Sequence, residues 1–290
     1  MIFAALVAAV SVQTISSSME YDGVTRTYTL VVPSDARENA RGAPLVVVLH
    51  GYGGTGSGSI DRYGFVAAAE RIGAIVVAPN GVRRAWNDGR QQDVANVDDV
   101  GFVTALVGML RARYHIDASR IGAAGMSNGA IFAQRLACER SDLFTAVVSV
   151  AGSMPAQLAC APSRAVSVML VAGTRDPLVP YDGGGVGYLH GRGEVIGAPE
   201  TFARWRAIDR CGGVAPTVAL PATVDDGTTV SLQSATGCNE GSGVALYTVT
   251  GGGHAWPEEL RPLPALLVGI ASANLDATNA ACAFIVGHPR

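Results

Sequence analysis

Three residues of this chain have the types and the order that acyl-transfer chemistry requires. The first is Ser127, the centre of a Gly-x-Ser-x-Gly motif that follows a short apolar run and precedes a helix-like segment. A serine on such a sharp strand-to-helix turn is lifted clear of its sheet, which is typical of a nucleophile. Side chains at Gly125 and Gly129 would collide with the neighbouring strand and helix. The motif therefore predicts Ser127 as a nucleophile.

An acid and a base follow, each in a loop just after an apolar run. Asp176 follows the run Val166 to Ala172, and His254 follows the run Ala245 to Val249 and three glycines. A serine hydroxyl is a poor nucleophile until an imidazole takes its proton, and a buried carboxylate holds that imidazole in the correct tautomer. The order serine, aspartate, histidine is that of α/β-hydrolases. We predict all three as catalytic residues.

Other acids compete with Asp176 for the role of the triad carboxylate. Asp182 lies in the same loop and remains an alternative, although Asp176 is nearer to the end of the strand. The neighbouring pair Asp98 and Asp99 is typical of the first turn of a helix, where acids complement the dipole. The acid is therefore expected at Asp176, with Asp182 as its competitor.

The tetrahedral intermediate of acyl transfer needs N–H donors for its oxyanion. One is expected from the Asn128 amide, directly after the nucleophile. The other is expected from the loop after the apolar run Leu45 to Leu49, where the Tyr52 amide is the candidate and the Gly53 amide the alternative. His50 precedes this loop and is expected to orient it rather than to act as the base.

Aromatic residues stand in or beside these loops. We predict that Tyr52, Trp86 and Trp256 form a wall for the acyl group, with Gly53 also at the binding site. Ordinary packing beneath the loops is the alternative for these side chains. The Gly-rich stretch Gly183 to Gly197 is interpreted either as a flap beside the site or as a plain surface loop.

Taken together, HGYGG, GMSNG, GTRDPLVPYDGG and GGGHAWP resemble the secreted poly(3-hydroxybutyrate) depolymerase and feruloyl-esterase family of α/β-hydrolases. The resemblance runs from about Tyr21 to the C-terminus and includes GVTRTYTLVVP, AWND and VDDVGFV. It places the triad on the same Ser127, Asp176 and His254, and the oxyanion loop on Gly51 to Gly53. The chain departs from the family at Cys282, where such proteins often have a large aromatic residue.

The resemblance implies a serine carboxylic ester hydrolase that works through an acyl-enzyme and needs no cofactor or metal. The chain ends soon after the base, so we expect no separate binding domain and favour soluble feruloyl, acetyl or short-chain esters. The alternative is a depolymerase of polyhydroxyalkanoate oligomers. Two alternatives of another class are an acyltransferase and a non-catalytic binding protein on the same fold.

Cysteine usage agrees with export. In proteins similar to this chain, the positions of Cys211 and Cys238 are bonded to each other. Cys138 and Cys160 flank a strand and form a second candidate pair, which leaves Cys282 as a buried free thiol. No cysteine spacing is typical of a zinc site. The apolar run Ile2 to Val10 is interpreted as part of an export signal, with a first strand or a tail as the alternative.

Length and composition bound the remaining choices. With 290 residues, 49% hydrophobic and 16% charged, the chain is long and apolar enough for one ordered domain, placed at residues 19–290 after a signal peptide or remnant at 1–18. A net charge of −3 gives no case for binding nucleic acid, and no apolar run is long enough to span a membrane. We expect a secreted or periplasmic monomer that acts on a small-molecule or polysaccharide-linked ester.

Candidate strands alternate with helices along most of the chain. This alternation predicts an α/β-hydrolase fold, with a mostly parallel, doubly wound sheet and helices on both faces. An apolar stripe from Val100 to Leu110 predicts a helix packed on that sheet. The strands are expected at Tyr28 to Val32, Leu45 to Leu49, Ala74 to Ala78, Ile121 to Ala124, Ala146 to Val150, Val166 to Ala172 and Ala245 to Val249.

Overall fold

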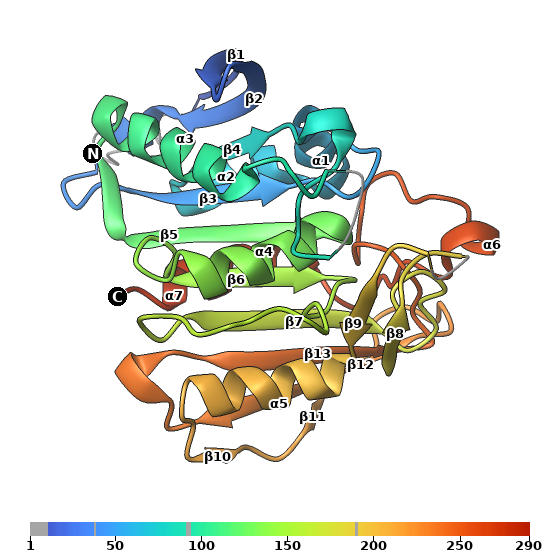
Figure 1. The fold of residues 1–290 in the computed structure, drawn as a ribbon. Coiled ribbons are helices and arrows are strands. Elements are labelled where there is room, and N and C mark those ends of the chain that lie inside the picture. Colours follow the sequence, from blue (N-terminus) through green and yellow to red (C-terminus); the bar gives the residue numbers. More distant parts are fainter. Residues whose placement is uncertain (1–10, 38, 91–93, 189–190) are drawn as a thin grey trace, which may run out of the picture.

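A computed structural model describes residues 11–37, 39–90, 94–188 and 191–290, and it is built on one large twisted sheet (Figure 1). From edge to edge the strand order is β1-β2-β4-β3-β5-β6-β7-β13-β12-β10, with β11 also paired to β12. The strands of this sheet are β1 (Val12–Tyr21), β2 (Val24–Pro33), β3 (Ala43–Leu49), β4 (Ile75–Pro79), β5 (Ile116–Met126), β6 (Ala146–Val150), β7 (Ser167–Gly173), β10 (Gly213–Val214), β11 (Val218–Ala219), β12 (Thr229–Thr236) and β13 (Val244–Thr250).

The centre of the sheet is parallel and its edges are antiparallel. Strands β4, β3, β5, β6, β7 and β13 run in one direction, whereas β1, β2, β12 and the short strands beside β12 pair antiparallel. Every residue of β3, β6 and β7 is buried, as expected for parallel strands that are covered on both faces. The predicted α/β-hydrolase fold is confirmed.

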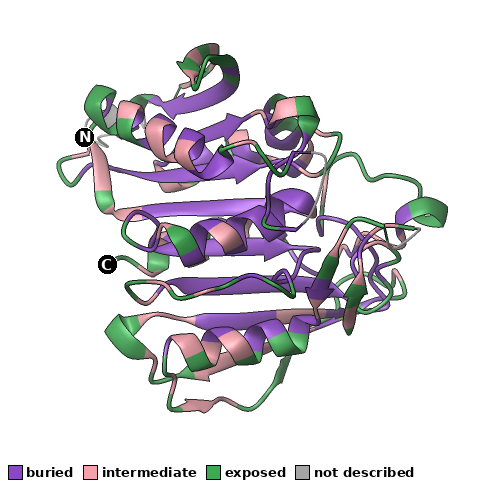
Figure 2. Cartoon of the chain, viewed as in Figure 1, coloured by how far each residue is buried: buried purple, intermediate pink, exposed green. Residues whose placement is uncertain are grey.

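Helices cover both faces of the sheet, and each face has its own core. Helices α3, α4 and α5 lie on the near face in Figure 1 and pack around Phe102, Phe132 and Trp205. Phe65 and Trp256 belong to the core on the other face, between the sheet and helices α1, α2 and α7. Figure 2 shows the buried strands between these helical layers. The helices are α1 (Gly56–Tyr63), α2 (Phe65–Ile72), α3 (Asp99–Arg113), α4 (Asn128–Glu139), α5 (Ala198–Ile208), α6 (Ala265–Val268) and α7 (Ala277–Gly287).

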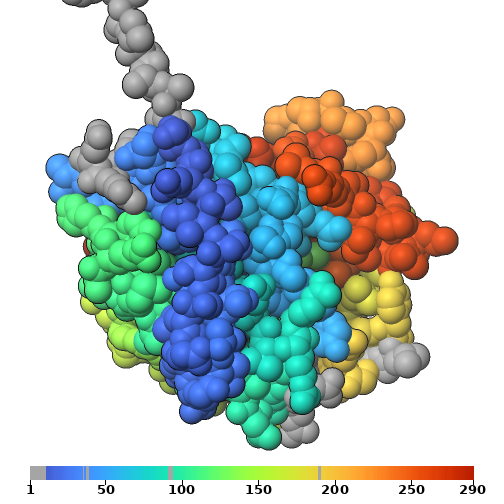
Figure 3. All heavy atoms as spheres, turned by 90° about the horizontal axis from the view of Figure 1, so that it is seen from above, coloured from blue at the N-terminus to red at the C-terminus, as the bar shows by residue number. Residues whose placement is uncertain are grey.

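The edge strands were not predicted. Strand β1 pairs with β2 over its whole length, and Figure 3 shows these N-terminal strands on the outer surface at this edge of the sheet. Residues 12–18 therefore belong to the folded domain, and the domain boundary placed after residue 18 is wrong. The apolar run Ile2 to Val10 lies outside the described residues. Strand β12 was missed because its residues are mostly half-buried and polar, without an apolar run.

The described part of the chain contains two disulfides, and they confirm both expected pairings. Cys138 at the end of α4 is bonded to Cys160, and Cys211 just after α5 is bonded to Cys238. Cys282 is a buried free thiol in α7, as expected. Within the described ranges, every helix is too short or too polar to cross a lipid bilayer.

Removing the bridge near the end of α5 should lower stability. The variant Cys211→Ser/Cys238→Ser frees a segment of 27 residues and is expected to lose about 3 kcal/mol of unfolding free energy, because the unfolded chain is no longer cross-linked. Denaturant unfolding of the variant and of the wild type measures this, both without a reducing agent because reduction would also open Cys138–Cys160. The control is Cys282→Ala, which should lose less stability because it leaves both bridges intact. A bridge-less variant as stable as the wild type would contradict the prediction.

Candidate active site

The turn at Ser127 joins β5 directly to α4. Ser127 has φ 55° and ψ −120°, a sterically unfavourable conformation for a residue with a side chain. A Cβ on Gly125 would lie 2.2 Å from the Gly129 carbonyl oxygen, and a Cβ on Gly129 would lie 2.3 Å from the Leu49 carbonyl oxygen in β3. Glycine is therefore required on both sides of the serine, as the sequence predicts, because helix and strand approach too closely for side chains.

Asp176 and His254 reach Ser127 from the ends of two neighbouring strands. Asp176 follows β7, and its Oδ1 accepts hydrogen bonds from the amides of Leu178 and Val179, both at 2.8 Å. His254 follows β13, in a loop that passes so close to the backbone at Gly269 that Gly253 has no room for a side chain. Because β7 and β13 are parallel and adjacent, their carboxyl ends bring acid and base together.

The three residues form a continuous chain of hydrogen bonds. His254 Nδ1–H donates to Asp176 Oδ2 at 2.8 Å, which leaves Nε2 to accept the proton of Ser127 Oγ, also at 2.8 Å. Asp176 and His254 are both buried, so the carboxylate acts on the imidazole in a region with little water. Asp182 takes no part in these bonds. The arrangement is that of a serine, its general base and the group that orients the base.

The loop after β3 lies against Ser127 and is held by the segment around Arg84. The Gly53 amide donates to the Arg84 carbonyl oxygen at 2.8 Å, so this amide is already engaged. The Tyr52 amide and the Asn128 amide have no acceptor among the described residues. Of the two amides that the sequence left open, Tyr52 is therefore the one free to bind a developing oxyanion. Gly53 itself also lines the pocket described below.

His50 is a structural residue of this loop, as expected. The Gly81 amide donates to His50 Nε2 at 3.0 Å, and His50 Nδ1 lies 2.8 Å from the Gly51 carbonyl oxygen. A ring nitrogen that accepts an N–H must be unprotonated, so the imidazole is neutral and donates through Nδ1. Burial lowers the pKa of His50 to about 4 from its ordinary 6.5.

A buried polar network fixes the start of α4. The side chain of Asn128 accepts from the Trp86 amide at 2.8 Å and donates to Asp88 Oδ2 at 2.6 Å. Asp88 in turn forms a buried ion pair with Arg90, at 2.6 Å. The sequence predicts the Asn128 amide as a donor, but the role of its side chain was not predicted, because it depends on contacts with the distant Trp86 and Asp88. The sequence features that marked this region were the AWND motif of the family resemblance and Trp86 within it, which was predicted to line the site.

Trp86 and Trp256 do not line the site, and their prediction as a substrate wall is wrong. Both are fully buried. Trp86 stacks on Phe132 and donates through Nε1 to the His50 carbonyl oxygen, and Trp256 stacks on Tyr63. Large rings next to a loop lower the free energy more by filling the space beneath it than by facing solvent. Of the three predicted aromatic residues, only Tyr52 faces the pocket, with nearly half of its surface exposed.

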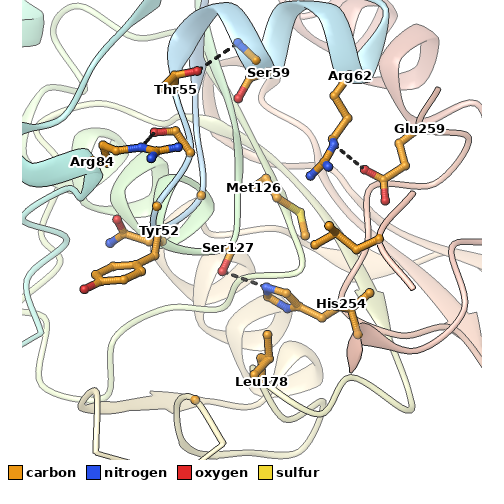
Figure 4. A pocket seen from close by; sticks show the side chains of 18 of the residues that line it. Tyr52, Thr55, Ser59, Arg62, Arg84, Met126, Ser127, Leu178, His254 and Glu259 are labelled. Carbon is orange, nitrogen blue, oxygen red and sulfur yellow. Dashed lines mark hydrogen bonds and ion pairs between the residues drawn. The ribbon is translucent and has the colours of Figure 1, made fainter. Parts of the chain in front are cut away.

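A pocket of about 970 Å³ opens over Ser127 and His254. Figure 4 shows Tyr52 and Arg84 on one side of the serine, and His254 with the Arg62–Glu259 ion pair on the other. The stretch Gly183 to Gly197, which forms the hairpin of β8 (Gly183–Gly185) and β9 (Glu194–Ile196), contributes to the wall. Apolar lining comes from Met126, Leu178, Val186, Leu263 and Val268.

Comparison with known proteins places the chain in a family. A model described as the prolyl oligopeptidase family matches residues 73–160. The putative esterase NocK of Nocardia uniformis subsp. tsuyamanensis is 32% identical over 278 residues, which cover 91% of this chain and 80% of that protein. Feruloyl esterase B of Piromyces equi is 28% identical over 74% of this chain. The chain belongs to the feruloyl-esterase-like family of α/β-hydrolases. This family membership makes it a serine carboxylic ester hydrolase.

The relatives differ from this chain in length, and other solved structures share its fold. This hydrolase spans 40% of the length of feruloyl esterase B. Among solved structures, an acetyl xylan esterase from Aspergillus awamori superposes with a TM-score of 0.59 over 89% of this chain and 97% of the other, at 14% identity. At that identity the likeness shows the fold alone.

Acidification should destabilise the hydrolase through His50. Its folded-state pKa of about 4 lies below the 6.5 of an ordinary histidine, so only the unfolded chain takes up this proton as the pH falls between those values. His50 therefore contributes roughly 3 kcal/mol to the free energy of unfolding above about pH 6.5, and this contribution is lost as the pH falls towards 4. In NMR spectra, the chemical shifts of the His50 ring carbons, assigned by comparison with His50→Gln, should still be those of a neutral imidazole at about pH 5. A titration midpoint of the His50 ring near pH 6.5 in the folded protein would refute this prediction.

Proposed function

We propose that this hydrolase cleaves soluble carboxylic esters with Ser127 as nucleophile, His254 as general base and acid, and Asp176 as the carboxylate that orients the base. One observation carries the proposal. The hydrogen-bonded chain from Asp176 through His254 to Ser127 opens into a pocket, beside two amides that have no acceptor among the described residues. That combination supplies a nucleophile, proton transfer and oxyanion stabilisation at one point.

The steps follow from this geometry. Ser127 Oγ attacks the ester carbonyl carbon while its proton passes to His254 Nε2, and the Tyr52 and Asn128 amides bind the oxyanion. The bond to the alcohol oxygen then breaks as His254 returns the proton to that oxygen, which leaves an acyl-enzyme. Water attacks the acyl-enzyme with His254 again as base, and the acid product leaves as Ser127 regains its proton. Asp176 stabilises the imidazolium formed in each half-reaction.

The pocket supports an aromatic or short-chain acyl group, such as a feruloyl or acetyl group on a polysaccharide fragment. Tyr52, Tyr63 and Tyr188 line it together with aliphatic side chains. Aromatic rings of the protein offer flat apolar surface to an aromatic acyl group. An acyltransferase would use the same residues, and analysis of products formed with added alcohols distinguishes transfer from hydrolysis.

A second candidate is hydrolysis of polyester oligomers, and an exposed apolar patch favours it. Leu260, Leu263, Leu266 and Leu267 lie around α6, and each has between 45% and 97% of its surface exposed. Leu263 also lines the pocket. A polymer chain with apolar segments would find such a patch next to the catalytic serine.

The two disulfides support an oxidising compartment, because cytosolic thiols are kept reduced. We therefore propose that the hydrolase acts outside the cytoplasm, in the periplasm or after secretion. Expression with and without residues 1–10, followed by fractionation of the cells, tests this proposal.

Ser127→Ala should keep the fold and lose at least about a thousandfold in kcat, because the members of a triad act as a unit. The measurement is hydrolysis of p-nitrophenyl acetate, butyrate and octanoate, with methyl ferulate in parallel. Turnover by the wild type that disappears in the variant is the expected result. Properly folded wild type that turns over none of these esters would refute the general esterase function.

Asp176→Asn should lower kcat strongly, because the amide cannot hold His254 in the required tautomer. The matched control is Asp182→Asn, six residues along the same loop, which is expected to stay within about twofold of the wild type. Both variants are assayed on p-nitrophenyl butyrate after their melting temperatures have been compared. The reverse pattern would move the acid to Asp182.

A further inference from the structure

The pocket over Ser127 is lined by more cations than anions. Arg62, Arg84, Arg90, Arg192 and Arg261 line it, against the carboxylates of Asp61 and Glu259. The chain as a whole carries a net charge of −3, so this excess is local and opposite in sign to that of the protein. A cleft lined by one sign of charge concentrates ligands of the other sign.

The positive side chains are not spread evenly around the pocket. On the side of His254, Arg62 is paired with Glu259 at 3.6 Å, so its charge is largely balanced. On the opposite side, the Arg192 guanidinium lies 3.8 Å from the centre of the Tyr52 ring, and Arg84 Nε donates to the Gly54 carbonyl oxygen at 3.2 Å. No carboxylate among the described residues pairs with Arg84 or Arg192.

Arg90 contributes an independent observation at the same side. Its side chain is 3% exposed, packs against Gly193 next to Arg192, and uses Nε and Nη2 to bind Asp88. Its Nη1 is buried and has no acceptor among the described residues. A buried donor left without a partner costs free energy, and an anionic group of a ligand is a partner that would satisfy it.

We propose that this hydrolase prefers esters whose acyl part carries a second, ionised carboxylate, bound by Arg192 together with Arg84 and Arg90. The proposal rests on the esterase function proposed above and names its substrate class. A planar guanidinium matches a carboxylate with two parallel hydrogen bonds. The Arg192 guanidinium lies over the Tyr52 ring, and its nitrogen donors have no acceptor among the described residues.

The acyl part is assigned to this side by the direction of proton transfer. His254 must reach the oxygen of the departing alcohol, so the alcohol lies towards His254 and the Arg62–Glu259 pair. Figure 4 shows Tyr52 and Arg84 on the other side of Ser127. We place the acyl group on that side, where it would extend towards the unbalanced arginines.

The test compares two rigid esters that differ only in charge, methyl 4-carboxycinnamate and methyl 4-carbamoylcinnamate. The readout is the ratio of their kcat/KM values. We expect the wild type to favour the carboxylate by about tenfold or more, and added salt to reduce this ratio. Arg192→Gln should bring the ratio close to one. Arg111→Gln, which removes the same charge from the exposed side of α3 outside the pocket, should keep the wild-type ratio.

The outcomes separate this inference from the function on which it rests. A wild-type ratio near one, with Ser127-dependent hydrolysis of both esters, would overturn the carboxylate preference and leave the esterase intact. A high ratio that survives in Arg192→Gln and in Arg84→Gln would overturn the arginine site. If folded wild type hydrolysed neither of these esters nor the p-nitrophenyl esters, both proposals would fall together.

Discussion

The close approach of α4 to the sheet at Ser127 governs the geometry of the whole site. The serine is held at φ 55° between two glycines whose neighbours leave no space for a Cβ. Such a conformation costs about 1–3 kcal/mol and persists only where the surroundings enforce it. Here the enforcement comes from the Ser127 amide, which donates to the Val150 carbonyl oxygen, and from the buried start of α4. The turn aims the hydroxyl at His254 and leaves the next amide free.

The second half of the proposed oxyanion site depends on polar groups that are buried and hydrogen-bonded to one another. His50 accepts from Gly81, Trp86 donates to the His50 carbonyl oxygen, and the Asn128 side chain bonds both to Trp86 and to Asp88. These bonds tie the loop after β3, the segment around Trp86 and the start of α4 into one unit. A buried network in which each of these groups is hydrogen-bonded restricts the loop to few arrangements of low energy, so the two amides are positioned before a substrate arrives.

The segment that contains Arg84 and Arg90 bears on the proposed substrate binding as well as on the proposed catalysis. The Arg84 carbonyl oxygen accepts from the Gly53 amide, and the Arg84 side chain lines the pocket. Arg90 forms the buried ion pair with Asp88. Groups that position the proposed oxyanion loop therefore also set the charge of the proposed acyl side. With the proposed catalytic site in this basic pocket, an acidic protein would select its substrate by charge as well as by shape.

Local sequence patterns determined the parts of this protein that depend on neighbouring residues. Apolar runs located the buried parallel strands, and the Gly-x-Ser-x-Gly motif together with the order of acid and base identified three side chains that the fold joins through two hydrogen bonds of 2.8 Å, both made by His254. Strands β1 and β12 were not predicted because they lie at or next to an edge of the sheet, are half exposed and lack such runs. The burial of Trp86 and Trp256, the choice of the Tyr52 amide over that of Gly53, and the grouping of arginines were decided only by the tertiary structure. These properties depend on which distant segments share a space, and no local pattern records that.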